Sequence, residues 1–276
     1  MSGLSPDCFS QLPALPVTFR DEKGISIHDV AVVSPSRLLV SHWTAAGTLS
    51  LVDSVNGGNV SSVCLPSVPE GVCLLHDGLA AVTQRVEQQI QFIRVDGDTL
   101  SLDKSIKVNG PVIGISACDS HLVVTYDRSV GVETITLDGR VIDKMDNKKA
   151  GKQVFQWPYY IAISSSGDDI FVSDSGTRTV IQMDRTLRIT RTFTSPMLKE
   201  PQGIVSVGTD QLLVADKECN SIVDLNPTNG NVTPLLGQAN GIHQPRAVAW
   251  CPDSKKLYVG RRLQSTLSVF KVRNEH

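Results

Sequence analysis

The chain has 276 residues, a mass of 29.8 kDa and a formal net charge of −2. Apolar residues make up 41% and charged residues 20% of it, which excludes an intrinsically disordered chain and is typical of a folded, turn-rich protein. Its apolar runs are far shorter than the ~20 residues that span a bilayer, and the segment Met1–Pro16 lacks the basic and apolar regions of a signal peptide. We therefore expect a cytoplasmic protein with no membrane partner.

The apolar segment 12–19 precedes the first repeat and has no neighbouring strand in the sequence with which to pair. After this segment, a short apolar strand recurs at intervals of 42 to 46 residues. The aligned residues of this strand are Val30, Val72, Ile115, Ile161, Ile204 and Val248.

Each repeat continues in the same way. A turn leads to a strongly β-prone run such as Leu38–Val40, then to an alternating run such as Thr48–Val52, and a turn such as Asn56–Gly58 introduces a more polar fourth strand. The sixth repeat stops before its fourth strand. We expect 12–19 to supply that strand, because an unpaired edge would otherwise remain exposed.

Repeats of four strands and about 40 to 50 residues are typical of propeller blades. The sequence therefore predicts a single all-β domain, a six-bladed β-propeller of four-stranded antiparallel blades in a ring closed by an N-terminal strand. The expected blades are 22–65, 66–108, 109–155, 156–198, 199–241 and 242–276.

Two further features concern loops and thiols. The basic stretch 144–152 is an insertion in the third repeat, which we expect to be a surface loop. The six cysteines have no Cys-x-x-Cys spacing, so the sequence predicts buried free thiols and no structural zinc site.

The last three repeats resemble the NHL repeat, which has the approximate form Pro-x-Gly-Ile, a β run ending in Val-x-Asp, a small polar turn and then alternating apolar residues. Pro201–Ile204 with Leu213–Asp216 matches best, Ile170–Asp174 comes next, and Gln244–Ala249 follows more loosely. The first three repeats keep only the strand pattern.

The whole chain is similar to the C-terminal propeller of NHL-class tripartite-motif (TRIM) proteins. The resemblance implies the division of labour of that family, in which upstream RING, B-box and coiled-coil segments transfer ubiquitin and assemble the protein, while the propeller recognises protein or RNA. The metal-ligand spacings and long heptads of those segments are absent from this sequence, so ubiquitin transfer is not expected of it.

In a propeller, the connections between blades and the bends between second and third strands emerge on one face, called here the first face. The other turns emerge on the opposite face. Positive and negative residues nearly balance on the first face, whereas aspartates dominate the opposite face. We expect Asp127, Asp174 and Asp216 to turn inward onto backbone N–H groups of their own bends, which leaves the first face more basic.

The first face is also expected to display many of the aromatic residues, namely His42, Trp43, Tyr126, Trp157, Tyr159 and His243. For any one of them, packing within or between blades is the competing interpretation. Exposed aromatic residues beside arginines suit a protein hot spot. The predicted partner-binding residues are Trp43, Arg85, Arg128, Tyr159, Arg178, Lys217, His243, Arg246, Arg261 and Arg262.

The leading hypothesis is a non-catalytic module that binds a protein, such as a substrate of a TRIM-type ubiquitin ligase. The alternative is RNA recognition on the same face, which a pI near 6.3 weakens. No DNA partner is expected.

A metal-dependent, lactonase-like hydrolase is a third possibility, because some six-bladed propellers hold a metal on the axis. Only Asp29, Glu70 and Asn109 lie near such positions, so we expect no cofactor and no metal. Ser26, His28 and Asp29 do not indicate a catalytic triad, since strand neighbours point to alternate faces and no Gly-x-Ser-x-Gly motif is present.

Overall fold

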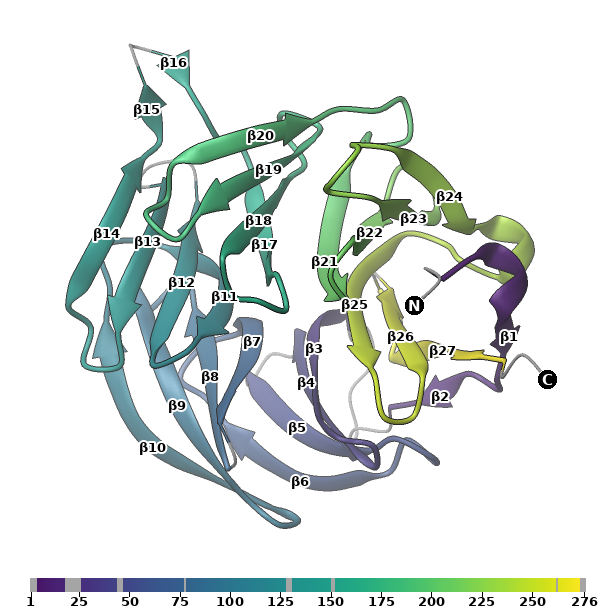
Figure 1. Cartoon of the computed structure of the whole chain (residues 1–276). Helices are drawn as coiled ribbons and strands as arrows, with labels where there is room; N and C mark the ends of the chain where they lie inside the picture. Colours follow the sequence, from purple (N-terminus) through teal and green to yellow (C-terminus); the bar gives the residue numbers. More distant parts are fainter. Residues whose placement is uncertain are drawn as a thin grey trace.

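The computed structural model is an all-β ring of six blades, each of four antiparallel strands, as the sequence predicts (Figure 1). It describes residues 4–17, 26–43, 47–76, 78–127, 131–149, 152–261 and 263–273. Arg128 and Arg262, two predicted partner-binding residues, lie outside these ranges.

The first strand of every blade faces the axis of the ring (Figure 1). These strands are β3 (Ser26–Ser34), β7 (Pro69–His76), β11 (Val112–Cys118), β17 (Pro158–Ile163), β21 (Pro201–Val207) and β25 (Pro245–Cys251). The second strands are β4 (Arg37–Trp43), β8 (Leu79–Gln84), β12 (His121–Tyr126), β18 (Asp169–Asp174), β22 (Gln211–Asp216) and β26 (Lys256–Arg261).

The outer half of each blade is more polar. The third strands are β5 (Thr48–Asp53), β9 (Gln89–Asp96), β13 (Gly131–Thr136), β19 (Thr179–Asp184), β23 (Ser221–Leu225) and β27 (Thr266–Val272). The fourth strands of blades 1 to 5 are β6 (Asn59–Cys64), β10 (Thr99–Lys107), β14 (Val141–Asp146), β20 (Ile189–Phe193) and β24 (Val232–Leu236).

The N-terminal segment closes the ring, as predicted. β1 (Phe9–Gln11) and β2 (Leu15–Pro16) both pair antiparallel with β27, so they act as the fourth strand of blade 6. The pairing begins before the predicted segment 12–19, because Phe9 lies opposite Val272 and packs among buried residues of blades 5 and 6.

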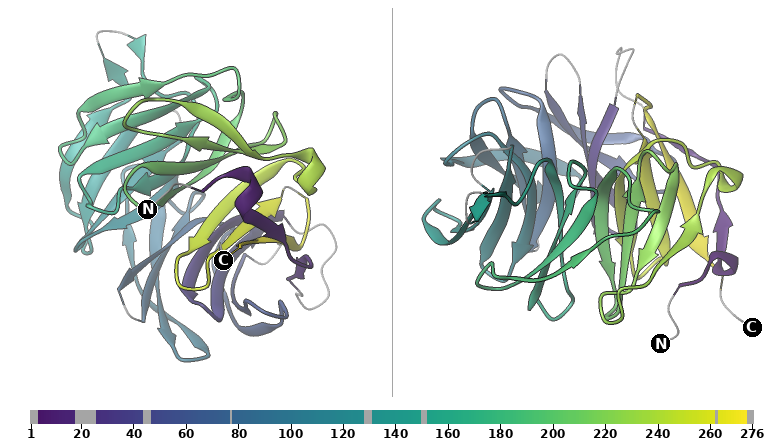
Figure 2. Two further views of the ribbon diagram at one scale, coloured as in Figure 1. Left: turned by 45° about the vertical axis from the view of Figure 1, so that its right-hand side comes forward. Right: turned by 90° about the horizontal axis from the view of Figure 1, so that it is seen from above.

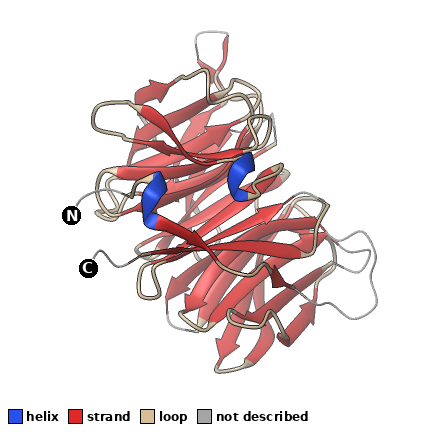
Figure 3. Ribbon diagram, turned by 90° about the vertical axis from the view of Figure 1, so that its right-hand side faces the viewer, coloured by secondary structure: helices blue, strands red, loops and turns tan. Residues whose placement is uncertain are grey.

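Almost no helix is present in the described ranges: η1 (Pro6–Cys8) and η2 (Gln238–Asn240) are single 3₁₀ turns (Figure 3). No helix among these residues has the length and hydropathy required to cross a membrane.

The hydrophobic core is divided among the interfaces between blades. Six clusters of buried apolar side chains lie between adjacent blades, one of them joining blade 6 to blade 1. The second strands supply many of these residues on both of their faces; Leu39 and Val40, for example, pack against blades 2 and 6 respectively. Each blade therefore buries its apolar surface only when both neighbours are in place.

A small residue at one position of the second strand lets adjacent blades approach closely. In three blades its buried hydroxyl donates a hydrogen bond to the first strand of the next blade. These bonds run from Ser41 to the carbonyl of Glu70 (2.8 Å), from Thr83 to that of Ile113 (2.6 Å) and from Ser173 to that of Gln202 (2.5 Å). Blade 6 has Gly260 here, and a Cβ at this residue would lie 2.8 Å from Cγ2 of Ile27.

Two local predictions are corrected by the structure. The described part of the stretch 144–152 contains strands and not only a surface loop: β14 continues to Asp146, and β15 (Lys148–Lys149) then pairs with β16 (Lys152–Gln153) in a hairpin that projects from the ring (Figure 1). All six cysteines are free, but only Cys73 and Cys251 are buried. Cys64 is exposed, and Cys8, Cys118 and Cys219 are partly exposed.

Replacement of Thr83 by valine tests the bonds between blades. Valine keeps the shape but leaves the N–H of Gly71 and the carbonyl of Ile113 buried without the hydroxyl. We expect unfolding free energy to fall by about 1 to 3 kcal/mol, measured by urea denaturation. The matched change Thr233→Val, on exposed β24, is expected to alter it by less than about 0.5 kcal/mol. Equal effects of the two substitutions would contradict the role assigned to Thr83.

Candidate partner-binding face

The first face is organised by two successive residues near the end of each second strand. The first of the two, called here the locking position, turns inward, and the next turns toward the face, as strand alternation requires. The locking positions are His42, Gln84, Tyr126, Asp174, Asp216 and Arg261.

In blades 4 and 5 a buried aspartate at the locking position fixes the surrounding loops. Asp174 accepts backbone N–H groups from Gly176 and Thr177 in its own bend and from the connection that enters blade 4. Asp216 does the same with Cys219 and with the connection entering blade 5. The predicted inward orientation of these two aspartates is confirmed.

In the other blades the locking position has a different residue, and His42, Tyr126 and Arg261 bond to side chains of the third strand of their own blade. His42 and Tyr126 are 1% and 0% exposed, so the prediction that they lie on the surface of the first face is wrong. Tyr126 donates to buried Glu133 at 2.6 Å, and Arg261 is half-buried with its Nε 3.1 Å from Oγ of Ser268. Asp127 is one residue past the locking position, and its carboxylate forms an ion pair with Arg85.

A β-bulge near the start of every first strand directs another side chain toward the axis. The pairing between first and second strands shifts register at this point in all six blades. The shift leaves residues of the first strand unpaired, and one of them has the same repeat position in every blade. We call this set of six the axial ring: His28, Glu70, Ile113, Tyr159, Gln202 and Arg246.

The charged members of the axial ring contact one another. Nδ1 of His28 lies 3.0 Å from Oε2 of Glu70, although the angle between them is outside hydrogen-bond geometry. A guanidinium nitrogen of Arg246 lies 3.4 Å from the same oxygen. Burial alone raises the pKa of Glu70, but His28, Arg246 and Arg85 outweigh this effect and lower it overall. Glu70 therefore carries a negative charge at neutral pH.

Tyr160 lies directly below this ring and links opposite blades. Its hydroxyl donates to the carbonyl of His28 in blade 1 and accepts from Nε of Arg246 at 3.2 Å. Burial is the main cause that raises the pKa of Tyr160, so the hydroxyl stays protonated. The Tyr160 side chain thus ties blade 4 to blades 1 and 6.

The structure brings three of the predicted partner-binding residues together. Arg85, Tyr159 and Arg246 lie near enough for both arginines to act on the pKa of the Tyr159 hydroxyl, which burial raises. Tyr159 also stacks on Trp157, with ring centroids 6.0 Å apart. Tyr159 and Arg246 belong to the axial ring, and Arg85 and Trp157 lie beside it.

The remaining described candidates lie farther out. Arg178 is exposed on the bend of blade 4 with a φ of 60°, and His243 is exposed on the connection into blade 6. Lys217 is occupied by an ion pair with Glu200, 2.5 Å apart. The side chain of Trp43 is the most open of the aromatic candidates, at 54% exposure.

Sequence reasoning missed two apolar residues that share the first face with Trp43. Val86 is 76% exposed on the bend of blade 2, and Leu263 is 61% exposed on the bend of blade 6. Since Trp43 lies on blade 1, the three residues occupy three consecutive blades. We call them the apolar arc. The sequence signal that could have identified Val86 and Leu263 is a large apolar residue within an otherwise polar bend.

The residues expected for an axial metal do not converge. Glu70 is held by His28 and Arg246, and Asp29 accepts the backbone N–H groups of Val30 and Val72. Asn109 donates to both carboxylate oxygens of Glu133 in the third strand of blade 3, at 3.1 Å each. Within the described ranges, no group of three or more His, Cys, Asp or Glu residues is arranged to hold a metal ion.

Comparisons with known proteins support the fold alone. No family model and no curated protein sequence matches the chain. Among solved structures, a Staphylococcus aureus virginiamycin B lyase, in a catalytically inactive histidine-to-alanine form with quinupristin, is 15% identical, with a TM-score of 0.67 over 96% of this chain and 100% of that one.

Two further structures have the same architecture. A streptogramin B lyase is 11% identical over 98% of this chain and 100% of that one, with a TM-score of 0.66. The hydrazine synthase of Kuenenia stuttgartiensis is 14% identical over 87% of this chain and 75% of that one, also at 0.66. Identities this low establish a six-bladed propeller and no activity. The NHL resemblance continues to rest on the repeats.

The buried locking residue His42 makes stability depend on pH. Burial, and then repulsion from His28, lowers the pKa of His42 from 6.5 to about 4. The unfolded chain therefore binds more protons than the folded chain below pH 6.5, and stability is lost as the pH falls toward 4. Between pH 7 and 5 we expect wild type to lose about 2 kcal/mol more than His42→Gln, measured by denaturation at both pH values. Parallel losses would contradict this assignment.

Proposed function

We propose that the protein is a non-catalytic recognition module that binds a protein partner on its first face. The observation that carries this proposal is the apolar arc of Trp43, Val86 and Leu263 on three consecutive blades. Large apolar side chains gathered on one face favour a protein contact, since water-exposed apolar area is stabilised when a partner covers it.

The charges near the apolar arc support the same proposal. Arg85 adjoins Val86, and its side chain remains 42% exposed while it pairs with Asp127. Tryptophan and arginine are enriched in the residues that dominate the energy of protein interfaces. The axial ring beside them contains both signs of charge, through Glu70 and Arg246, which suits a partner surface of mixed charge better than a uniform polyanion.

The acid and base groups of the axial ring support a non-catalytic role. His28, Glu70, Arg246 and Tyr160 contact one another in a closed network. A general base must reach a proton of a substrate, and here Glu70 is held by two basic side chains. The streptogramin lyases show that the same architecture can host an enzyme, so the geometry of these residues carries the argument and the fold does not.

RNA recognition is a weaker candidate on this face. Single-stranded RNA binders stack bases on exposed aromatic rings. Of the six aromatic residues predicted there, His42 and Tyr126 are buried, and Trp157 and Tyr159 are half-buried against each other. The NHL resemblance leaves both classes of partner open, and the apolar arc favours protein. A substrate of a TRIM-type ubiquitin ligase in the cytoplasm is the partner class that this resemblance suggests.

Introducing negative charges into the apolar arc tests the proposed face. Val86→Asp and Leu263→Asp change two exposed residues of the apolar arc, and Val55→Asp is a matched control because Val55 is 74% exposed on the opposite face. In quantitative crosslinking from cells, we expect partners to be lost at least tenfold with the double variant and retained with the control. Equal recovery with both variants would overturn the assignment of the face.

Two direct assays separate the other classes of function. We expect no salt-dependent binding of single-stranded RNA, measured by fluorescence anisotropy at low and high salt. We also expect no change in the chromatographic retention of quinupristin after prolonged incubation with the protein, since ring opening by elimination would give an isomer of equal mass that elutes differently. Salt-sensitive RNA affinity abolished by Trp43→Ser would favour the RNA reader, and turnover of quinupristin would show an enzyme.

A further inference from the structure

A partly open channel runs along the axis below Tyr160, on the side away from the first face. It has a volume of about 280 Å³, and first strands from all six blades line it. Most residues along it are apolar, with partly exposed Val32, Leu74 and Trp250 among them, although polar atoms supply more of the exposed wall than apolar atoms do. The Tyr160 hydroxyl, bonded to His28 and Arg246, closes the upper end.

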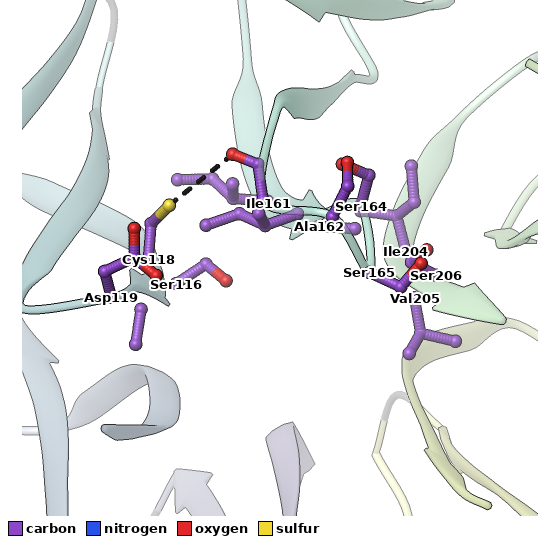
Figure 4. Close-up of a pocket in the computed structure, with 14 residues that line it drawn as sticks. Ser116, Cys118, Asp119, Ile161, Ala162, Ser164, Ser165, Ile204, Val205 and Ser206 are labelled. Carbon is purple, nitrogen blue, oxygen red and sulfur yellow. Dashed lines mark hydrogen bonds between the residues drawn. The ribbon is translucent and has the colours of Figure 1, made fainter. Parts of the chain in front are cut away.

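The lower end of the channel opens into a more polar groove. This groove has a volume of about 410 Å³ and lies between blades 3, 4 and 5 (Figure 4). Ser116, Ile161, Ile204 and Val205 line both spaces, so the two are continuous. Figure 4 shows serines around the groove, including Ser164 and Ser206, and the thiol of Cys118, which donates to the carbonyl of Gly167 at 3.6 Å.

Asp29 is the one carboxylate that lines the channel, and no lysine, arginine or histidine among the described residues lines it. Other blades have glycine, alanine or tyrosine at the repeat position of Asp29, and a Cβ at Gly71 or Gly203 would lie within 2.8 Å of the neighbouring backbone. Blade 1 instead places a carboxylate there, where it bridges to Val72 of blade 2 at 3.0 Å.

This carboxylate is poised between its charged and neutral forms. Burial raises the pKa of Asp29 to about 7, against the opposing effects of the backbone N–H groups of Val72 and Val30 and of the positive charge of Arg246. A cation entering the channel would stabilise the charged form, whereas an anion would be repelled and would find no basic partner on the walls.

We propose that the axial channel binds a small primary amine with an apolar body, its ammonium group at the Asp29 carboxylate and its body along the partly exposed side chains of Val32, Leu74 and Trp250. Pockets for small ligands combine such apolar walls with one or two polar groups that fix orientation. The ligand enters from the groove, because Tyr160 and the axial ring close the other end. The channel is separate from the apolar arc, so an experiment that contradicts one of the two sites leaves the other unaffected.

Three isosteric probes test the charge preference: phenethylamine, 2-phenylethanol and phenylacetate. We expect phenethylamine to bind with a Kd of about 1 mM or tighter, about tenfold more tightly than the alcohol, with no binding of the acid. Methyl shifts in ¹H–¹³C NMR spectra should map to Val72, Ile115, Ile161 and Val205. Equal affinity for amine and alcohol, or shifts elsewhere only, would overturn the proposal.

Two variants of the full chain test the location. Asp29→Asn is expected to reduce amine affinity to that of the alcohol. Because this change also weakens the bond to Val72 and so lowers the stability of the chain, Ser116→Phe provides a second test by blocking the junction of channel and groove. It should abolish binding of both ligands, while Thr233→Phe on exposed β24 should not. Unchanged amine binding by Ser116→Phe would place the ligand outside the channel.

Discussion

The structure depends on the packing of each blade between two others. Every blade has apolar side chains on both faces of its inner strands, and the six clusters they form lie between blades. The blades stand side by side around the ring (Figures 1 and 2). No blade can bury this surface alone, so removal of one interface leaves two apolar faces in water. The pairing of β1 and β2 with β27 completes the last blade and so supports all the others. The hydroxyls of Ser41, Thr83 and Ser173 add directed bonds where the blades are closest.

The candidate site follows from two local departures from regular strands. The bulge in each first strand leaves one residue unpaired and directs it to the axial ring, so neighbours in that ring, such as His28 and Glu70, come from different blades. The locking position holds the loops of the first face by buried hydrogen bonds, most clearly at Asp174 and Asp216. The residue after it, such as Trp43 or Arg85, is thereby displayed on a rigid support. A preorganised surface of this kind loses little conformational entropy when a partner binds.

The repeat predicted the fold well because hydrophobic spacing determines which strands pair and which faces are buried. It also predicted the inward turn of Asp174 and Asp216, whose short carboxylates suit a tight bend. It failed at His42 and Tyr126, since side chains of any type at the locking position are drawn inward and residue type alone suggested exposure. The contact of His28 with Glu70 was not predictable, because alternation along a strand gives no sign of a bulge. The sequence did place Asp29 near the axis, but it does not give the size of the open space there, which depends on the width of the closed ring.

Ring closure by the N-terminal strands is the claim on which the scaffold, and therefore both proposed sites, rests. Native-state hydrogen exchange of the whole chain and of a deletion lacking residues 1–17 tests it most directly. If closure supports the entire ring, the deletion should accelerate exchange in β17 and β18 of blade 4, on the opposite side of the ring from blade 1, as well as in β27. Faster exchange confined to β27, with wild-type protection in blade 4, would contradict it.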